Sequence, residues 1–335
     1  MVNLAVVGAG YWGPNLVRNF LEISDCAVLW ICDEKKGRLK YVQDRWPHIP
    51  VTSDFKTVIN DPRVDAVVLA TPMTTHHALG IAALNQDKHV FIEKPLATSS
   101  VDAGELVELA NKRGLIIATG HLFVFHPAVS TMRTLLENDS IGALCYAESS
   151  RVNLGPPNAR DNVIWDLAVH DISILLHLWR KKAIEVNAVG RCFRHPRLID
   201  TAFINVKFED DTFSQHHVSW LSPDKIRRFF VAGAKGVLSF DDTAMTKLKV
   251  IGLGEDSRVG LKDDEVKDLY YKPDKIHAPE IKAAEPLRVE CEHFVSCVKD
   301  EIQPVANGES GLAVVKILEA AQNSIIRNSI PIALS

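Results

Sequence analysis

Asp166 and His170 are two side chains that could perform acid–base chemistry together, since four positions separate them in the segment 165–171, WDLAVHD. On a helix, side chains four positions apart lie on the same face. A carboxylate can there orient an imidazole and stabilise its charge, and an imidazole transfers protons near neutral pH. Taken alone, an Asp–His pair on an apolar helix is more often structural than catalytic, so other residues must decide.

Lys94 is a third candidate, in the tripeptide Glu93-Lys94-Pro95 that closes the apolar run 89–92. Thr71-Pro72 closes the earlier run 66–70 in the same way. In open α/β sheets, ligands bind outside the carboxyl ends of the strands. Lys94 is therefore placed to reach a ligand bound at this edge, although it could also be a solvated lysine at a strand end.

The segment 8–13, GAGYWG, fits the G-x-G-x-x-G pattern and follows the first predicted strand directly. Gly8 permits a tight turn, Gly10 lets the backbone approach a pyrophosphate, and Gly13 allows close packing of helix on strand. Pro14 stands where a first helical position is expected. The N-terminus of that helix would offer unpaired N–H groups and a positive dipole end to the phosphates.

Asp33 ends the second predicted strand, 20 residues after Gly13. A carboxylate at this point accepts hydrogen bonds from the ribose diol of adenosine and repels a 2′-phosphate, which favours NAD over NADP. Glu34 strengthens this preference, whereas Arg38 opposes it. The alternative is a glycine turn in a domain that binds nothing, with Asp33 as a helix cap.

Strand-like apolar runs alternate with amphipathic segments in residues 1–122, which predicts a doubly wound parallel sheet of the α/β class. The predicted strands are 3–8, 27–32, 51–53, 66–70, 89–92 and 115–119; the predicted helices are 14–23, 34–45, 75–85 and 99–113. We therefore expect a dinucleotide-binding Rossmann domain over 1–122.

Residues 123–335 predict a second α/β domain, with a mostly antiparallel sheet that helices cover on one face. Its predicted strands are 185–193, 202–208, 213–220, 227–232, 236–240 and 247–251. Helices are predicted at 128–138, 163–179, 287–299 and 309–327, and a long loop with one strand at 268–272 is predicted over 254–285.

The charge balance of the 335-residue chain, 38 Lys and Arg against 42 Asp and Glu, gives a net charge of −4. With no long basic block, it argues against a nucleic-acid or membrane partner. Neither a secretory signal nor a membrane span is expected. The six cysteines form no Cys-x-x-Cys pair, which indicates reduced thiols in a cytoplasmic protein. The histidine pairs 76–77 and 216–217 lack acidic or Cys ligands at metal spacing, so no metal site is predicted.

As a set, GAGYWG at 8–13, EKP at 93–95 and D-x-x-x-H-D at 166–171 resemble the Gfo/Idh/MocA oxidoreductases, and the resemblance covers nearly the whole chain. It implies hydride transfer between NAD(P) and a sugar or cyclitol carbon, with Lys94, Asp166 and His170 as the catalytic group. It further implies a cis Lys-Pro peptide and a homo-oligomer, a dimer or tetramer, built on the open sheet.

The segments 120–129, 153–155 and 160–166 resemble the nucleotide-sugar 3-dehydrogenase branch of this family, which oxidises C3 of UDP-N-acetylglucosamine or of its uronic acid before an aminotransferase acts. The chain departs from that branch at Val124 and Phe125, where many members have Arg, and at Val169, where Pro is common. The first departure concerns substrate contacts.

Three groups of site residues are thus expected. The catalytic group is Lys94, Asp166 and His170. The residues expected to bind NAD are Gly8, Gly10, Tyr11, Trp12, Gly13, Asp33, Thr71, Pro72, His76, Glu93 and Lys94. The residues expected to bind a nucleotide sugar are Lys94, His121, Arg160, Asn162, Trp165 and His170. Arg160 and Asn162 could grip a diphosphate or sugar hydroxyls, or belong to a solvated loop, and Trp165 could pack on a ligand or fill the core.

The chemistry predicted from these residues is NAD-dependent oxidation of a sugar carbon to a keto sugar. The alternatives are an inositol or free-sugar dehydrogenase of the same fold and a catalytically silent NAD-binding protein. A silent relative would be expected to lack Lys94 or His170, and both are present. A DNA-binding regulator would need a basic face or a helix-turn-helix signal.

Overall fold

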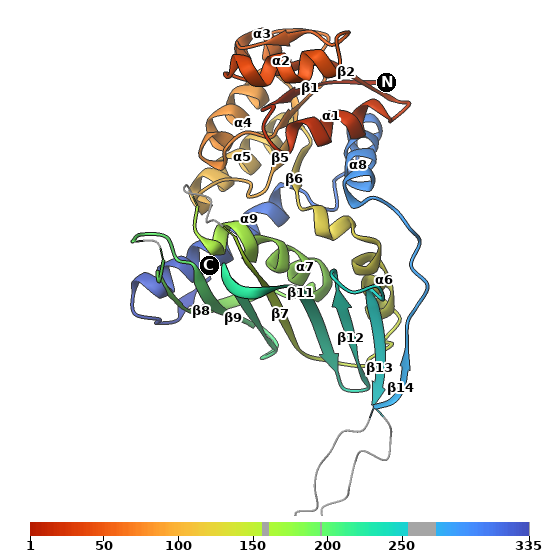
Figure 1. Cartoon of the computed structure of the whole chain (residues 1–335), viewed down its shortest axis with the longest axis vertical. Coiled ribbons are helices and arrows are strands. Elements are labelled where there is room, and N and C mark those ends of the chain that lie inside the picture. The colour runs from red at the N-terminus through yellow and green to blue at the C-terminus, as the bar shows by residue number, and fades with distance from the viewer. Residues whose placement is uncertain (156–160, 195, 254–272, 335) are drawn as a thin grey trace, which may run out of the picture. The chain divides into compact units, whose positions relative to one another are not determined.

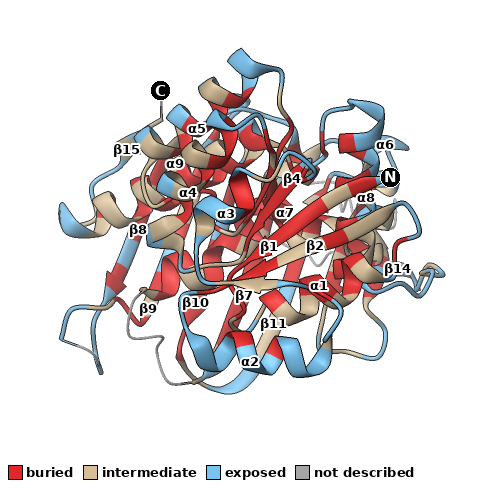
Figure 2. Ribbon diagram, turned by 90° about the horizontal axis from the view of Figure 1, so that it is seen from above, coloured by how far each residue is buried: buried red, intermediate tan, exposed pale blue. Residues whose placement is uncertain are grey.

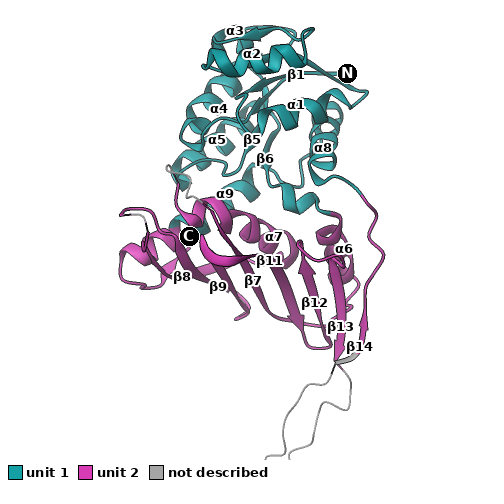
Figure 3. Ribbon diagram, in the orientation of Figure 1, with its two compact units in different colours: residues 1–126, 284–319 teal, residues 127–283, 320–335 magenta. Residues whose placement is uncertain are grey.

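The computed structural model describes residues 1–155, 161–194, 196–253 and 273–334, in two compact units (Figures 1 and 3). Unit 1 comprises residues 1–126 and 284–319, and unit 2 comprises 127–283 and 320–335. The single boundary expected at 122/123 differs from this division, because residues 284–319 belong to unit 1. Within the described ranges, no helix is both long and apolar enough to cross a membrane.

Unit 1 contains a six-stranded parallel sheet in the order β3-β2-β1-β4-β5-β6. Its strands are β1 Val2–Val7, β2 Cys26–Cys32, β3 Val51–Thr52, β4 Ala66–Leu69, β5 His89–Glu93 and β6 Ile117–Gly120. This is the strand order of the Rossmann fold. Every residue of β4 is buried (Figure 2). Its uninterrupted apolar run predicted this, because a parallel sheet is covered on both faces. The predicted doubly wound domain is confirmed.

The helices of unit 1 are α1 Gly13–Leu21, α2 Lys36–Arg45, α3 Phe55–Ile59, η1 Met73–Thr75, α4 His76–Asn85, α5 Ser100–Arg113, η2 Leu122–Phe125, α8 Pro286–Asp300 and the first part of α9 Gly308–Ile326. Local signals fix their ends. The Ser99 hydroxyl accepts a hydrogen bond from the backbone N–H of Asp102 at the start of α5, and Gly114, with φ of +67°, ends that helix.

Helix α8 belongs to unit 1 because its apolar face completes the core of the parallel sheet. Phe294 makes edge-to-face contacts with Phe20 of α1 and Phe91 of β5, at centroid distances of 6.4 and 5.5 Å. Leu287, Cys291 and the valines of α8 join the same cluster of buried residues. Such packing between distant segments of the chain is invisible in local sequence patterns.

Unit 2 contains a nine-stranded sheet in the order β14-β13-β12-β11-β7-β10-β9-β8-β15. Its strands are β7 Leu144–Leu154, β8 Ala183–Arg191, β9 Thr201–Phe208, β10 Phe213–Ser219, β11 Leu221–Gly233, β12 Gly236–Asp241, β13 Leu248–Leu253, β14 Pro273–His277 and β15 Ile332–Ala333. Strands β7 and β10 run parallel and the other neighbours antiparallel, which confirms the mostly antiparallel sheet. The strand predicted at 268–272 lies outside the described residues.

Helices α6 Pro127–Glu137 and α7 Val169–Trp179 pack against each other and contact the sheet of unit 2. One continuous helix was predicted over 163–179. Instead, a π-helical turn, η3 Ile164–Ala168, precedes α7. π-Helical turns inside helices frequently lie at functional sites. This turn carries Asp166, one member of the predicted catalytic pair.

Candidate active site

The glycine turn after β1 leaves no room for side chains at two of its positions. Gly8 has a φ of +100°, and a Cβ there would lie 2.4 Å from the carbonyl oxygen of Ala70. A Cβ on Gly13 would lie 1.9 Å from the carbonyl oxygen of Gly8. Helix α1 begins at Gly13, with Pro14 in its first turn. The turn therefore has the tight packing and the helix N-terminus that a pyrophosphate site requires.

The other turn residues differ in exposure. Tyr11 is 85% exposed and rests edge-on against the half-buried Trp12, with ring centroids 5.6 Å apart. The atoms nearest to a Cβ built on Gly10 belong to the Arg38 guanidinium, at 3.6 Å or more. The nearest neighbour of Gly10 is thus a side chain, whereas Gly8 and Gly13 lie against backbone atoms.

Asp33 follows β2 and is buried, with both carboxylate oxygens engaged. Oδ2 accepts hydrogen bonds from the backbone N–H of Ala9 at 2.8 Å and from Arg38 Nη1 at 3.3 Å, and Oδ1 accepts from the N–H of Lys35 at 2.8 Å. The carboxylate thus fixes the glycine turn to β2. Carboxylate oxygens retain further lone pairs for ribose hydroxyls. Arg38 is directed at Asp33 in this geometry.

At the end of β4, the imidazole of His76 connects two loops. Its Nδ1 lies 2.8 Å from the carbonyl oxygen of Pro95 and its Nε2 lies 3.0 Å from that of Thr71. His76 is 1% exposed, and burial lowers its pKa. Both nitrogens thus face backbone carbonyl oxygens, and a neutral imidazole donates its single N–H to one of the two. Thr71 is half-buried and Pro72 is exposed.

Lys94 follows β5, and its peptide bond to Pro95 is cis. Burial, and after it the positive charge of Lys94, lowers the pKa of two neighbours, His76 and His121. Glu93 Oε2 accepts the backbone N–H of Lys94 at 3.3 Å. Burial nevertheless raises the pKa of Glu93 to about 7. Lys94 thus lies beside an acid that titrates near neutral pH.

His121 follows β6 and is 2% exposed. Burial, helped by the charge of Lys94, lowers its pKa to about 3, so the imidazole is neutral near pH 7. Neither ring nitrogen has a hydrogen-bond partner within the described ranges. A buried, neutral imidazole beside Lys94 is available to hydrogen-bond a ligand.

In unit 2, the predicted catalytic pair occupies the two half-exposed positions of the otherwise buried stretch 163–175. These positions are Asp166 in η3 and His170 in α7. Asp166 Oδ2 accepts a hydrogen bond of 3.2 Å from Trp220 Nε1. The burial pattern therefore supports the shared face expected from their spacing, despite the π-helical turn.

Asn162 and Trp165, predicted to contact substrate, both donate hydrogen bonds to Gln322 Oε1 of α9, each at 2.8 Å. Asn162 Oδ1 in turn accepts the backbone N–H of Ile164 at 3.0 Å, as a capping side chain does. Trp165 is 6% exposed. These polar groups anchor the start of η3. The burial of Trp165 fits the alternative interpretation that it fills the core. Arg160 lies outside the described residues.

Asp171, which directly follows His170, was not among the predicted site residues. Its carboxylate is 1% exposed and binds Arg151 and Ser149 of β7, and the Ser149 hydroxyl lies 2.7 Å from His216 Nδ1. Burial lowers the pKa of His216 to about 4. This network fixes α7 to the sheet. Its place as the final Asp of the D-x-x-x-H-D motif is the feature of the sequence that could have singled it out.

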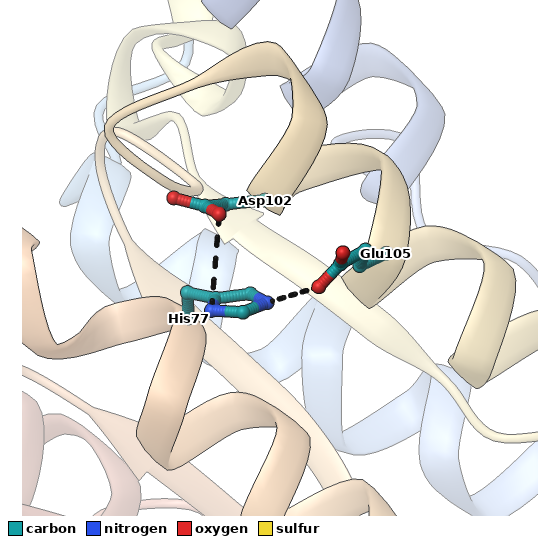
Figure 4. A group of neighbouring side chains, drawn as sticks. All are labelled: His77, Asp102 and Glu105. Atoms are coloured by element: carbon teal, nitrogen blue, oxygen red, sulfur yellow. Dashed lines mark hydrogen bonds and ion pairs between the residues drawn. The ribbon is translucent and has the colours of Figure 1, made fainter.

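Figure 4 shows the group among the described residues whose atoms are spaced as metal ligands would be, although no metal was predicted. His77 of α4 lies 2.8 Å from Glu105 Oε2 and 3.9 Å from Asp102 Oδ1, both on α5. Glu105 is exposed, and the two carboxylates explain the arrangement as ion pairs that connect α4 with α5.

Comparison with known proteins decides the family. One family model, an oxidoreductase family with an NAD-binding Rossmann fold, matches residues 2–121, and the GFO/IDH/MocA C-terminal domain matches residues 129–239. The chain belongs to the Gfo/Idh/MocA oxidoreductase family. The predicted family, Rossmann domain and NAD cofactor are thereby confirmed.

Several Gfo/Idh/MocA relatives indicate the range of chemistry. The scyllo-inositol 2-dehydrogenase (NAD(+)) of Bacillus subtilis is 24% identical over 99% of this chain and 96% of its own length. The UDP-N-acetylglucosamine 3-dehydrogenase of Acidithiobacillus ferrooxidans is 36% identical over 55% of this chain and 56% of its own length. A crystal structure named GnnA, with the same activity and organism, has a TM-score of 0.81 at 23% identity, covering 97% and 96% of the two chains.

Proposed function

We propose that this protein is an NAD-dependent sugar dehydrogenase that oxidises C3 of a UDP-linked N-acetylhexosamine, or of its uronic acid, to a 3-keto sugar for later transamination. The observation that carries the dehydrogenase assignment is the position of Lys94, beside neutral His121, at a strand end of the NAD-binding domain. The UDP-N-acetylglucosamine 3-dehydrogenase of Acidithiobacillus ferrooxidans, 36% identical over 55% of this chain, supports the nucleotide-sugar substrate.

The residues around the glycine turn fit NAD. The close packing at Gly8 and Gly13 sets the N-terminus of α1 directly after β1, where it would bind the pyrophosphate, and Asp33 is fixed at the end of β2 for the ribose. Tyr11, Trp12, Thr71, Pro72 and Glu93 complete the proposed NAD site. When bound, NAD accepts the hydride from the sugar carbon.

The chain's own side chains handle the proton and the charge. His170 takes the proton of the sugar hydroxyl, and the Asp166 carboxylate, fixed by Trp220, stabilises the resulting imidazolium. Lys94 stabilises the negative charge that develops on the sugar oxygen. His121, Arg160, Asn162 and Trp165 remain our proposal for the substrate site, with Asn162 and Trp165 acting through the position of η3.

A substrate panel tests the proposal by the initial rate of NADH formation with UDP-N-acetylglucosamine, its uronic acid, scyllo-inositol and myo-inositol. We expect a nucleotide sugar to give the highest kcat/KM. A higher value with an inositol would assign the second candidate, which the full-length match to an inositol dehydrogenase favours. No NADH with any compound, despite measurable NAD binding, would contradict the dehydrogenase assignment.

We also propose that the protein is a homo-oligomer assembled through one face of the nine-stranded sheet. Phe203 and Phe213 are 42% and 52% exposed on neighbouring strands β9 and β10, and Phe203 stacks on His217 with centroids 4.3 Å apart. Exposed aromatic clusters on a sheet typically mark an interface. Light scattering should give a dimer or tetramer, and Phe203→Asp with Phe213→Asp should give a monomer that still binds NAD.

A further inference from the structure

Glu290 is a buried carboxyl group that the proposed reaction does not use. It lies on α8, is 2% exposed, and has Cys291 and Phe294 of the apolar core as near neighbours along the helix. Neither carboxyl oxygen has a direct hydrogen-bond partner within the described ranges. Burying an ionised carboxylate without a partner costs several kcal/mol, so such a group is expected to keep its proton.

A second unpartnered polar atom shares a small cavity with Glu290. The Thr119 hydroxyl is fully buried on β6 and has no hydrogen-bond partner within the same described residues. Thr119, Glu290 and His293 line a cavity of about 10 Å³, measured as the space open to the centre of a water molecule, and its other walls are apolar. That is roughly the space one buried water needs, and a water needs two or more polar partners.

This cavity lies next to the strand end that carries Lys94. Glu93 pairs with Gly120, the residue after Thr119, and a Cβ on Gly120 would lie 3.1 Å from Glu93 Oε2. The Glu93 carboxylate therefore lies over β6. It is also close enough to Glu290 for its charge to act on that group.

The two carboxyls have different surroundings. Burial, followed by the charge of Glu93, raises the pKa of Glu290 well above its usual value. Burial raises the pKa of Glu93 to about 7, opposed by the charge and backbone N–H of Lys94. Since Lys94 favours ionisation of Glu93 alone, a single proton belongs on Glu290.

The other titratable groups around the pair stay neutral. His293 Nε2 accepts the backbone N–H of Val305 at 3.0 Å, and burial lowers the pKa of His293. Burial lowers the pKa of His121 to about 3 and raises that of the Cys291 thiol well above its usual range. Lys94 and Glu93 are thus the groups here that carry charge near and above neutral pH.

We propose that Glu290 is a positioning residue, a permanently protonated carboxyl that binds one internal water together with the Thr119 hydroxyl and holds the Glu93 carboxylate beside Lys94. By remaining neutral, Glu290 allows Glu93 to ionise and to act as the counter-ion of Lys94. The consequence for catalysis rests on the proposed function, whereas the protonation state of Glu290 does not.

Infrared spectroscopy tests the protonation state without turnover. At about pH 8, above the pKa of Glu93, the difference spectrum of wild type minus Glu290→Gln should contain the carbonyl band of a protonated carboxylic acid. Wild type minus Glu93→Gln should lack it. Glu292→Gln is the matched control, since Glu292 is exposed on the same helix. Absence of the band from the Glu290→Gln difference spectrum would overturn the proposal.

The pH dependence of sugar oxidation tests the positioning role. Glu290→Gln should keep the wild-type profile within about twofold at each pH, because the amide is neutral and still binds the water. Glu290→Leu removes those hydrogen bonds and should lower kcat about tenfold and displace the limb near pH 7, with NAD affinity unchanged. If Glu290→Leu keeps the wild-type pH profile of kcat, Glu290 has no positioning role and only fills the core. If no sugar is oxidised, the proposed function fails, and the infrared result still decides the state of Glu290.

Discussion

The Arg151 guanidinium of β7 donates two hydrogen bonds to one oxygen of the Asp171 carboxylate on α7, from Nε at 2.9 Å and from Nη2 at 2.7 Å. The two side chains are 3% and 1% exposed, so this is a buried ion pair. It connects the residue that follows His170 to the centre of the nine-stranded sheet. The position of the proposed base therefore depends on this buried pair.

Asp171→Asn should destabilise the protein by about 3–5 kcal/mol, because the buried guanidinium loses its counter-charge. Denaturant unfolding followed by circular dichroism measures this change. Asp139→Asn is the control: its partner Lys235 lies 3.0 Å away, but both side chains are about two-thirds exposed, and the expected loss is below about 1 kcal/mol. Equal losses in the two variants would show that burial of the Arg151 pair has no energetic consequence.

Gly13→Ala should abolish NAD binding or folding of the turn, since the new Cβ would lie 1.9 Å from a backbone oxygen that cannot move aside cheaply. Gly104→Ala, in the middle of α5 with no atom within 4 Å of the new Cβ, should instead stabilise the helix by up to about 1 kcal/mol. Calorimetric titration with NAD and thermal unfolding of both variants provide the comparison. Wild-type NAD affinity in Gly13→Ala would contradict the assigned role of the turn.

The sequence was sufficient for elements whose pattern is local. The uninterrupted apolar strands and the glycine turn predicted unit 1, and β4, buried at every position, shows why. Strand β7 was not predicted, although it is central in the sheet of unit 2. Its buried positions include Ser149 and Arg151, which satisfy each other's polar groups through Asp171 and so leave no apolar alternation to recognise.

The candidate site likewise contains residues that local motifs predict and residues that only long-range packing explains. Lys94, Asp166 and His170 were predicted as a catalytic group from their motifs and from the family resemblance, and they stay a proposal. The Gln322 anchor of η3 could not be predicted, because Asn162 and Trp165 lie 160 and 157 residues away from it in the chain. The burial of Glu290 could not be either, because distant segments such as β6 line its cavity. Long-range burial decides the chemistry of such groups, and burial follows only from the folded arrangement.

Asp33→Asn should weaken NAD binding about tenfold and reduce the preference for NAD over NADP. The amide loses the charge that accepts hydrogen bonds from Ala9, Lys35 and Arg38, and it no longer repels a 2′-phosphate. Titration with each cofactor measures both effects. Glu34→Gln is the control, because Glu34 is exposed, and it should change either affinity by less than about twofold.

His121 should make the protein less stable in acid. Its pKa of about 3 in the folded chain is below the usual 6.5, so between these values the unfolded chain binds the proton and the folded chain does not. Stability is therefore lost as the pH falls from 6.5 towards 3, by roughly 2–3 kcal/mol two pH units below 6.5. His121→Gln removes this contribution, so its stability relative to wild type should rise as the pH falls. A pH-independent difference would contradict neutral burial of His121.

Lys94→Ala and His170→Asn should each lower kcat for sugar oxidation by about 10²–10⁴, because each removes a group that handles charge or a proton in the transition state. NAD affinity of His170→Asn should stay within about twofold of wild type, since His170 belongs to unit 2 and the NAD-binding turn to unit 1. The pH dependence of kcat then shows which of the two residues is the base. In the variant that lacks the base, kcat should no longer depend on the ionisation that limits the wild-type rate. Lys112→Ala, at an exposed position of α5, is the matched control and should leave every parameter unchanged. Near wild-type turnover in both Lys94→Ala and His170→Asn, with NAD still bound, would contradict the proposed catalytic group.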